Sequence, residues 1–358
     1  MVNVTKSFLP DREEYIKYIH EIWDRVQLTN NGPLLQRLED ELKTYLGVEN
    51  LYYCGNGTIV LQIALKVLEI TKEVITTPFS YVATTNSILW EKCAPVFVDI
   101  DRNTFNIDPA LIEAAITPDT QAIMATHVYG NPCAVHEIEA IARRHSLKVI
   151  YDAAHAFGVR FQGRSLLSYG DLSTCSFHAT KVFHTIEGGA LISNHPELHE
   201  KIQLLRAFGH RGDEEYFYAG INGKNSEFHA AMGLCNLPHV PEIISARREV
   251  FEQYDTQLNW DRLTKPKINP EIEYNYAYYP VVFETYDVMR RVQSALLENQ
   301  IAPRRYFYPS LNTLTFLPKF YPCPVSEDIS SRVLSLPLYA GQPADEIETI
   351  SRVINQNL

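Results

Sequence analysis

Short apolar runs alternate with segments of helical periodicity through the first half of this chain, and this alternation constrains the fold more than any other feature. The apolar runs span residues 50–54, 73–78, 95–99, 121–126 and 148–152, with helical patterns between them. Strands that are apolar throughout are buried on both faces, as in parallel sheets covered by helices. The sequence therefore predicts an α/β fold with a mainly parallel central sheet.

Polar or glycine-rich groups follow several of these predicted strands. In chain order they are Gly57-Thr58, Phe79-Ser80-Tyr81, His127, Asp152 and Lys181. In open α/β sheets, ligands bind at the carboxyl ends of the strands. The sequence therefore predicts that these groups share one binding site, although each of them alone could be ordinary turn or core chemistry.

Lys181 is the residue in this set that most needs an explanation. It stands between two apolar runs, residues 171–177 and 188–193, that are predicted as strands. A lysine near a core must be paired, neutralised or used, and a neutral amine is a nucleophile that forms a Schiff base with an aldehyde. The alternative is a lysine at a strand end that points to water.

Together these residues describe a pyridoxal phosphate site. Lys181 would hold the aldehyde, and Asp152 would keep the pyridine nitrogen protonated. Tyr81 would stack on the ring. The phosphate would be bound by Ser176 and by the helix start at Gly57-Thr58, where free backbone N–H groups and the helix dipole favour an anion.

Composition and net charge limit which partners, metal sites and cellular locations we expect for this chain. The chain has 358 residues and a formal net charge of −11, which argues against partners that are nucleic acids or anionic membranes. Its six cysteines form no CxxC pair or zinc spacing, so we expect free buried thiols, no metal site and a cytoplasmic location. We find no signal peptide and no apolar run long enough to span a bilayer.

Several segments resemble the DegT/StrS family of sugar-nucleotide aminotransferases. They are Pro78–Thr84, Asp152–Gly158, Ser176–Lys181, Glu187–Ala190 and Asn222–Ala231. The resemblance implies the aspartate aminotransferase (type I) fold, with a large cofactor domain over residues 1–240, whose N-terminal segment packs at the active site, and a small C-terminal domain over residues 241–358. It also implies a homodimer with shared active sites, L-glutamate as amino donor and a nucleotide-linked keto-sugar as acceptor.

The same resemblance implies roles for individual residues. By motif, Lys181 is the Schiff-base lysine, Asp152 the pyridine partner, His155 the contact to the ring hydroxyl and Tyr81 the stacking aromatic. Phosphate would be held by Thr58, Ile59 and Ser176, and Asn222 would reach the phosphate of a partner subunit. Two departures stand out: Ile59 and Val60 replace small residues, and the segment from Asn222 reads Asn-Gly-Lys-Asn where the family often has Asn-Tyr-Arg-Met.

Within the family, the segments around Asn30, Thr76 and Ser226 resemble the enzymes that aminate dTDP-4-keto-6-deoxyglucose in the synthesis of lipopolysaccharide O-antigen. The diphosphate of such a substrate needs local cations on a chain of net charge −11. The candidate substrate-binding residues are Asn30, Asn31, Phe79, His210, Arg211, Lys224, Arg304, Arg305 and Tyr306.

Other activities of the same fold stay open at this point. The acceptor could be a 3-keto sugar or a GDP- or UDP-linked 4-keto sugar. A keto-sugar dehydratase would carry histidine in place of Lys181, and a regulator without catalysis would have no use for the complete cofactor set. An amino-acid lyase would need an arginine for the α-carboxylate, a role that Arg304 could fill. Stereochemistry at the aminated carbon depends on which face of the sugar meets Lys181.

Overall fold

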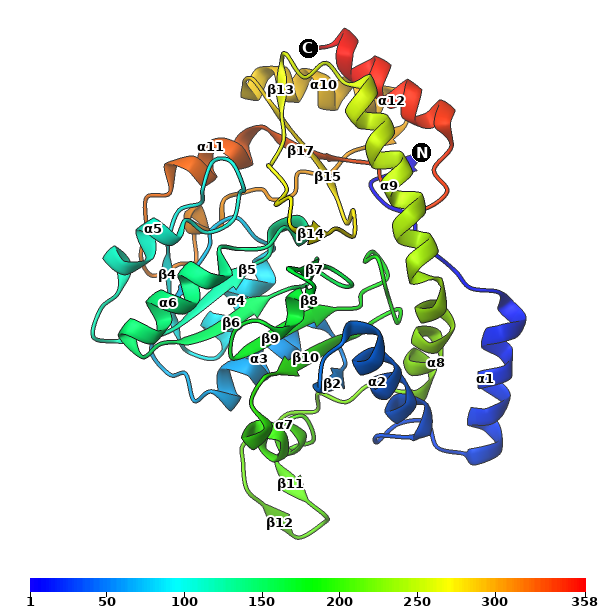
Figure 1. The fold of residues 1–358 in the computed structure, drawn as a ribbon, viewed down its shortest axis with the longest axis vertical. Helices are drawn as coiled ribbons and strands as arrows, with labels where there is room; N and C mark the ends of the chain where they lie inside the picture. The colour runs from blue at the N-terminus through cyan, green and yellow to red at the C-terminus, as the bar shows by residue number, and fades with distance from the viewer.

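The computed structural model describes residues 1–358 and is built around a seven-stranded sheet (Figure 1). Its strands lie in the order β2 (Asn50–Cys54), β10 (Gly189–Ser193), β9 (Leu172–Ser176), β6 (Lys148–Asp152), β5 (Thr120–Thr126), β3 (Glu73–Thr76) and β4 (Ala94–Phe97). Only β10 runs antiparallel to its neighbours. The predicted α/β fold with a mainly parallel sheet is confirmed.

Helices cover both faces of this sheet, because successive strand residues alternate between two apolar clusters. Leu51 and Tyr53 enter a cluster of 42 buried residues, whereas Tyr52 and Cys54 enter one of 19. The first cluster includes residues of α2 (Pro33–Leu46), α5 (Pro109–Ile112), α6 (Val135–His145) and α8 (Glu227–Asn236). The second includes residues of α3 (Gly57–Val67), α4 (Val82–Trp90) and α7 (His199–Leu205). The helix α1 (Arg12–Arg25) packs beside α8.

A second, smaller sheet lies beyond the long helix α9 (Val240–Gln257), which leads away from the central sheet (Figure 1). It consists of β13 (Leu263–Thr264), β15 (Tyr279–Phe283) and β17 (Val333–Leu336). The helices α10 (Tyr286–Glu298) and α12 (Ala344–Gln356) complete its core, and α11 (Pro324–Arg332) contacts β15. This change of sheet near residue 240 agrees with the place where the sequence divides into two domains, a division that itself stays a prediction.

Short strand pairs join parts of the chain that are distant in sequence. At the N-terminus, β1 (Val2–Asn3) pairs with β16 (Ile301–Ala302). The strand β7 (Arg160–Phe161) pairs with both β8 (Arg164–Ser165) and β14 (Ile272–Glu273). The hairpin of β11 (His210–Arg211) and β12 (Glu215–Tyr216) projects from the body of the molecule (Figure 1). No helix combines the length and the apolar character needed to cross a bilayer.

One strand predicted from the sequence is wrong in its middle. The run of apolar and aromatic residues from 272 to 284 predicts a single strand, but only Ile272–Glu273 and Tyr279–Phe283 pair in sheets. Between them, Tyr276 has a φ of 51°, in the left-handed region that no extended strand contains. The segment is instead held by the Arg247 side chain of α9 and by its own Asn275 side chain, which donates to backbone carbonyls of the loop after β6.

The open edge of the central sheet is protected by a buried ion pair. The edge strand β2 leaves the N–H and C=O of Tyr53 without a strand partner. Glu39 of α2 accepts from Tyr53 N at 2.7 Å, and Arg206 donates to Tyr53 O at 3.2 Å. The two side chains also bind each other and are 7% and 4% exposed. These contacts satisfy the backbone N–H and C=O of Tyr53 and so block the addition of a further strand at this edge.

Arg206→Met should therefore lower the free energy of unfolding by about 3–5 kcal/mol, because it leaves the Glu39 carboxylate buried without its partner. Denaturant titration of the variant measures this loss. The matched control is Arg37→Met on α2, whose ion pair with Glu41 is exposed and should contribute less than about 1 kcal/mol. Equal losses in the two variants would contradict the assigned role of Arg206.

Candidate active site

A cavity of about 350 Å³ lies at the carboxyl ends of the central strands. Its walls come from the start of α3, the ends of β6 and β9, the loop between β9 and β10, and the segments that contain Tyr278 and Arg304. Among the lining residues are Gly57, Thr58, Ser80, Tyr81, Asp152, His155, Ser176, Lys181, Tyr278, Arg304, Tyr306 and Phe307. The structure thus brings together the strand-end groups Thr58, Tyr81, Asp152 and Lys181, which the sequence predicted to be close.

Asp152 ends β6 and is 5% exposed. Its carboxylate accepts from Thr84 Oγ1 at 2.6 Å and from Ala154 N at 3.1 Å. Thr84 is held in turn by Ser80, whose hydroxyl lies 2.8 Å from Thr84 Oγ1. Burial raises the pKa of Asp152, and the hydrogen bond from Thr84 opposes that rise. Both of its donors are neutral, so its charged form is favoured by cations in the cavity, and the Lys181 ammonium already lowers the pKa of Asp152 in part.

Lys181 lies in the turn between β9 and β10 and is partly buried. Its backbone N–H donates to His178 O at 2.9 Å, which closes the turn. Its amine donates to the hydroxyl of Tyr278 at 3.3 Å, and no carboxylate lies within ion-pair distance. The lysine is therefore neither buried among the strands nor simply turned to water, but directed into the cavity.

His155 follows β6 and is 5% exposed. Its Nδ1 accepts from Tyr129 N at 3.2 Å, so the ring proton of the neutral form is on Nε2. Burial lowers the pKa of His155 well below its ordinary value, and the neighbouring Lys181 ammonium adds to this shift. His155 is thus a neutral imidazole with one N–H to offer at the cavity wall.

The predicted phosphate site is built from the start of α3 and the end of β9. Gly57 allows their close approach, since a Cβ at this position would come within 2.8 Å of Ser176 Cβ. Thr58 N and Ile59 N donate to Asn56 Oδ1 at 3.0 and 2.9 Å, so the helix caps itself here. Thr58 and Ser176 line the cavity, whereas the partly buried Ile59 packs on the smaller of the two sheet clusters. The Ile59 side chain therefore packs against the core while its N–H is bound to Asn56, and its predicted contact with phosphate stays a prediction.

The mouth of the cavity is aromatic and carries a positive charge. Tyr81 is 50% exposed, and its ring lies 6.5 Å from that of Tyr306. The Arg304 guanidinium lies 4.2 Å from the centre of the Tyr306 ring and has no carboxylate partner. Of the basic residues proposed from the sequence, Arg304 is the one that lines the cavity.

The other basic candidates lie elsewhere in this chain. Arg211 pairs with Glu200, and Lys224 lies over the ring of Phe208 at 4.4 Å. His210 contacts Gly212 O on the projecting hairpin. Arg305 donates to the carbonyls of Ser330 and Ser331 and stacks on Tyr308. None of them lines the cavity.

Three polar candidates also lie outside the cavity. Asn30 and Asn31 are exposed, in the turn before α2, with φ values of 61° and 58°. That turn is fixed by the buried Glu227, which accepts from Leu34 N and Leu35 N at 2.9 Å each. Asn222 is exposed at the base of the projecting hairpin.

Two residues singled out in the sequence have core positions. Phe79 is fully buried and packs against Phe105 and Phe307, so its predicted contact with substrate stays a prediction without a contact surface in this chain. His127 is fully buried and stacks on Tyr151, and burial lowers the pKa of His127 to about 3. Both residues follow strands, but their side chains point into the protein.

The sequence missed Tyr278 and Thr84. Thr84 could have been found, because it stands one helical turn after Ser80 at the start of α4 and so shares its face. Nothing in the local sequence indicates that Tyr278 reaches the cavity, because it lies within the strand predicted over residues 272–284.

These residues fit pyridoxal phosphate. The buried Asp152 carboxylate needs a cationic partner, which a protonated pyridine nitrogen would supply. Lys181 offers an amine without a competing ion pair, and His155 offers an N–H. Thr58 and Ser176 offer hydroxyls beside a helix start that only glycine allows to approach so closely. No group of acidic, histidine or cysteine side chains could hold a metal ion.

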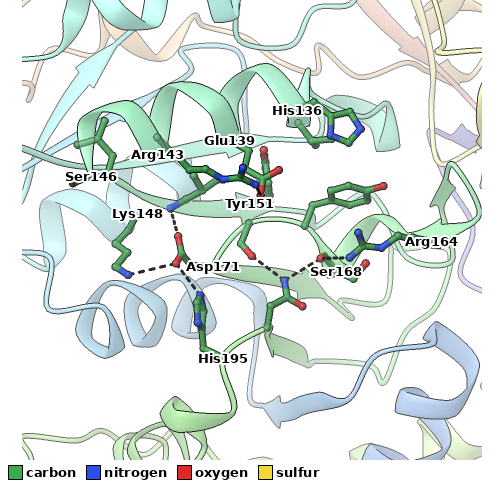
Figure 2. Close-up of a pocket in the computed structure, with 17 residues that line it drawn as sticks. His136, Glu139, Arg143, Ser146, Lys148, Tyr151, Arg164, Ser168, Asp171 and His195 are labelled. Carbon is green, nitrogen blue, oxygen red and sulfur yellow. Dashed lines mark hydrogen bonds and ion pairs between the residues drawn. The ribbon is translucent and has the colours of Figure 1, made fainter.

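A second cavity, of about 630 Å³, lies near the opposite ends of β6 and β9 (Figure 2). Its two carboxylates are paired with basic groups, whereas Arg164 donates to Ser168 O. Asp171 binds His195 at 2.9 Å and lies 3.5 Å from Lys148, and Glu139 binds Arg143 at 2.6 Å. Because these charges already have partners, this cavity lacks the unpaired carboxylate and amine that distinguish the strand-end site.

The chain is similar to known proteins over nearly its whole length. The model of the DegT/DnrJ/EryC1/StrS aminotransferase family matches residues 10–355. A dTDP-4-amino-4,6-dideoxy-D-glucose transaminase from Shigella dysenteriae is 44% identical, over 99% of this chain and 98% of the relative.

Two solved structures extend the comparison. One is DesI in the presence of its TDP-sugar product, with a TM-score of 0.94, 31% identity, and coverage of 99% of this chain and 92% of the other. Another is the PLP-form of the sugar aminotransferase Spr1654 from Streptococcus pneumoniae, with a TM-score of 0.90, 25% identity, and coverage of 99% of both chains.

Proposed function

Because this chain belongs to the DegT/DnrJ/EryC1/StrS aminotransferase family, we propose that it aminates a nucleotide-linked keto-sugar, dTDP-4-dehydro-6-deoxy-D-glucose. The product is dTDP-4-amino-4,6-dideoxy-D-glucose. The observation that supports this substrate most directly is the 44% identity, over nearly the full length of both chains, to a transaminase named for that product. Lys181 in the strand-end cavity favours transamination over the dehydratase alternative.

The cofactor is pyridoxal phosphate, which supplies an electron sink when a proton leaves the substrate carbon. Lys181 is the residue that would attach it, and Asp152 would pair with its ring nitrogen. His155 would donate to its ring hydroxyl from Nε2. Thr58 and Ser176 would bind its phosphate, and Tyr81 would cover one face of its ring.

The chain's own groups account for the proton movements that transamination requires. With the cofactor bound, an unattached Lys181 Nζ would be a base within the cavity that could take a proton from one carbon and return it to another. Burial raises the pKa of Asp152, so a cationic partner such as a protonated ring nitrogen would favour its charged form.

We further propose L-glutamate as amino donor, a homodimer as the working form and the cytoplasm as its location. The projecting hairpin supports the dimer, because it exposes Phe208, Tyr216 and Phe217 at 48%, 71% and 50%. Exposed aromatic groups gathered on one hairpin mark a protein contact more often than a solvated loop. In such a dimer, Asn222 and Lys224 at the base of the hairpin would serve the partner's cavity.

The test is an assay of the purified protein with glutamate and a panel of keto-sugars. The panel contains dTDP-4-keto-6-deoxyglucose, its 3-keto isomer, and GDP- and UDP-linked 4-keto sugars. Mass spectrometry detects the amine, and NMR coupling constants assign its axial or equatorial position. Formation of a deoxygenated product without nitrogen, or preference for another nucleotide, would contradict the proposed function.

Arg304 is expected to bind the diphosphate of the acceptor. Arg304→Ala should raise KM for the nucleotide sugar about 10- to 100-fold, because a charged hydrogen bond contributes about 1.5–3 kcal/mol. The value of kcat should change little, since the contact is the same before and after the chemical step. Arg290→Ala, an exposed arginine on α10 that contacts only Gln293, is the control. A rise in KM for glutamate alone would instead assign Arg304 to the donor carboxylate.

A further inference from the structure

The segment that interrupts the predicted strand over 272–284 is held at several points. Asn275 is 1% exposed, and its amide nitrogen donates to His155 O at 2.8 Å and to Phe157 O at 2.9 Å. From α9, the 4%-exposed Arg247 donates to Tyr276 O at 2.9 Å and to Ala277 O at 2.7 Å. The backbone just before Tyr278 is therefore fixed both to the cofactor-side loop after β6 and to the helix that leads to the second sheet.

Tyr278 extends from this fixed segment to Lys181. Its hydroxyl accepts the hydrogen bond from Lys181 Nζ at 3.3 Å. Its ring packs edge-on against His155, with ring centres 4.8 Å apart, and lies 5.6 Å from the rings of both Tyr129 and Tyr306. The ring alone would satisfy this packing. The hydroxyl has Lys181 as its only hydrogen-bond partner, so packing does not explain it.

We propose that Tyr278 is a positioning residue for Lys181, an inference that rests on the proposed transaminase function. A lysine amine ends a flexible four-carbon side chain and can be directed many ways when it is not attached. The Tyr278 hydroxyl fixes one N–H of Lys181, so that the amine stays in the cavity while it holds the proton between its removal and its return. The clamp by Asn275 and Arg247 sets where that hydroxyl lies.

Tyr278→Phe tests this role, because it removes the hydroxyl and keeps the ring. The rate of a single half-reaction, followed in a stopped-flow experiment with excess glutamate, should fall about 10- to 100-fold. This is less than the roughly 10²–10⁴-fold that the acid–base group itself contributes, because Tyr278 acts only through Lys181. The KM values for both substrates should change less than about threefold, because no substrate contact is lost. The matched control is Tyr276→Phe, two residues before Tyr278. It also removes a hydroxyl and keeps the ring, which packs on Phe251.

A second readout uses the cofactor-free protein. Limited acylation with an amine-directed reagent, followed by peptide mass spectrometry, gives the reactivity of Lys181 relative to the exposed Lys66. We expect this ratio to rise at least about threefold in Tyr278→Phe, because the amine is no longer held. It should stay unchanged in Tyr276→Phe.

The two readouts separate the possible failures. A slow half-reaction with unchanged labelling of Lys181 would make Tyr278 a packing residue only and overturn the proposal. Changed labelling with wild-type turnover would overturn it as well. If the wild-type protein fails to aminate any keto-sugar but the labelling ratio still rises, the proposed function fails while the contact between Tyr278 and Lys181 stands.

Discussion

Lys181→Ala should abolish transamination, with kcat reduced by about four orders of magnitude or more. The variant loses both the amine that attaches the cofactor and the group that moves the proton, and acid–base catalysis alone accounts for about 10²–10⁴. Product formation with glutamate and the keto-sugar measures the loss. Borohydride, which fixes the cofactor on its lysine, should label a Lys181 peptide in the wild-type protein and none in the variant.

The fold should be unaffected, because Lys181 makes no ion pair and its backbone hydrogen bonds do not depend on its side chain. The melting temperature of the cofactor-free variant should therefore equal that of the wild type. Lys148→Ala, at the second cavity, is the matched control and should keep full activity. Wild-type turnover by Lys181→Ala would remove the basis of the assignment.

Asp152→Asn should lower kcat/KM by roughly 150- to 5,000-fold. It replaces the charged partner of the cofactor ring by a neutral group of the same shape, and removal of one member of a buried charged pair costs about 3–5 kcal/mol. The hydrogen bonds to Thr84 and Ala154 can be retained, since an amide oxygen accepts from Ala154 N and an amide nitrogen donates to Thr84 Oγ1. The loss should therefore lie in chemistry and not in folding.

The same variant should make the cofactor-free protein more stable at neutral pH. Burial raises the pKa of Asp152 above its value in the unfolded chain, so above that raised pKa the folded protein bears an unfavourable charge. Below about pH 4 the carboxyl is protonated in both states and the difference disappears. Melting temperatures of the two cofactor-free proteins between pH 4 and pH 8 should diverge as the pH rises.

Asp119→Asn, in an exposed ion pair with Lys72, is the control for this pH series and should show little change. A neutral-pH stability of Asp152→Asn below that of the wild type would mean that the carboxylate is already compensated within the protein. That result would contradict the argument that Asp152 needs a cation supplied by a ligand.

The position of the cofactor-binding cluster could be predicted from the sequence because it depends only on strand direction. Parallel strands end at one edge of a sheet, so Asp152 and the groups that follow the other strands had to lie near one another once the apolar runs were recognised. Lys181 was predicted between two strands, and it lies in the turn that joins β9 and β10, at the same edge of the sheet.

The mouth of the cavity could not be predicted, because it depends on long-range packing. Nothing local distinguishes Arg304 from Arg305, yet one lines the cavity and the other binds the carbonyls of Ser330 and Ser331. Phe79 also follows a strand, but its neighbours on three elements bury it. Tyr278 was hidden in an apparent strand, because the clamp by Asn275 and Arg247 involves partners more than 25 residues away.

The residues that line the floor and the mouth of the cavity come from two separate parts of the chain. Its floor, with Asp152, Ser176 and Lys181, belongs to the central sheet, whereas Arg304 and Tyr306 at its mouth belong to a short stretch between α10 and α11. Mutations in that stretch can change what enters without altering the groups that perform the chemistry. A few substitutions in this stretch could therefore change the sugar that is accepted while the catalytic residues stay the same. Exchange of this stretch between relatives would test the same idea by engineering.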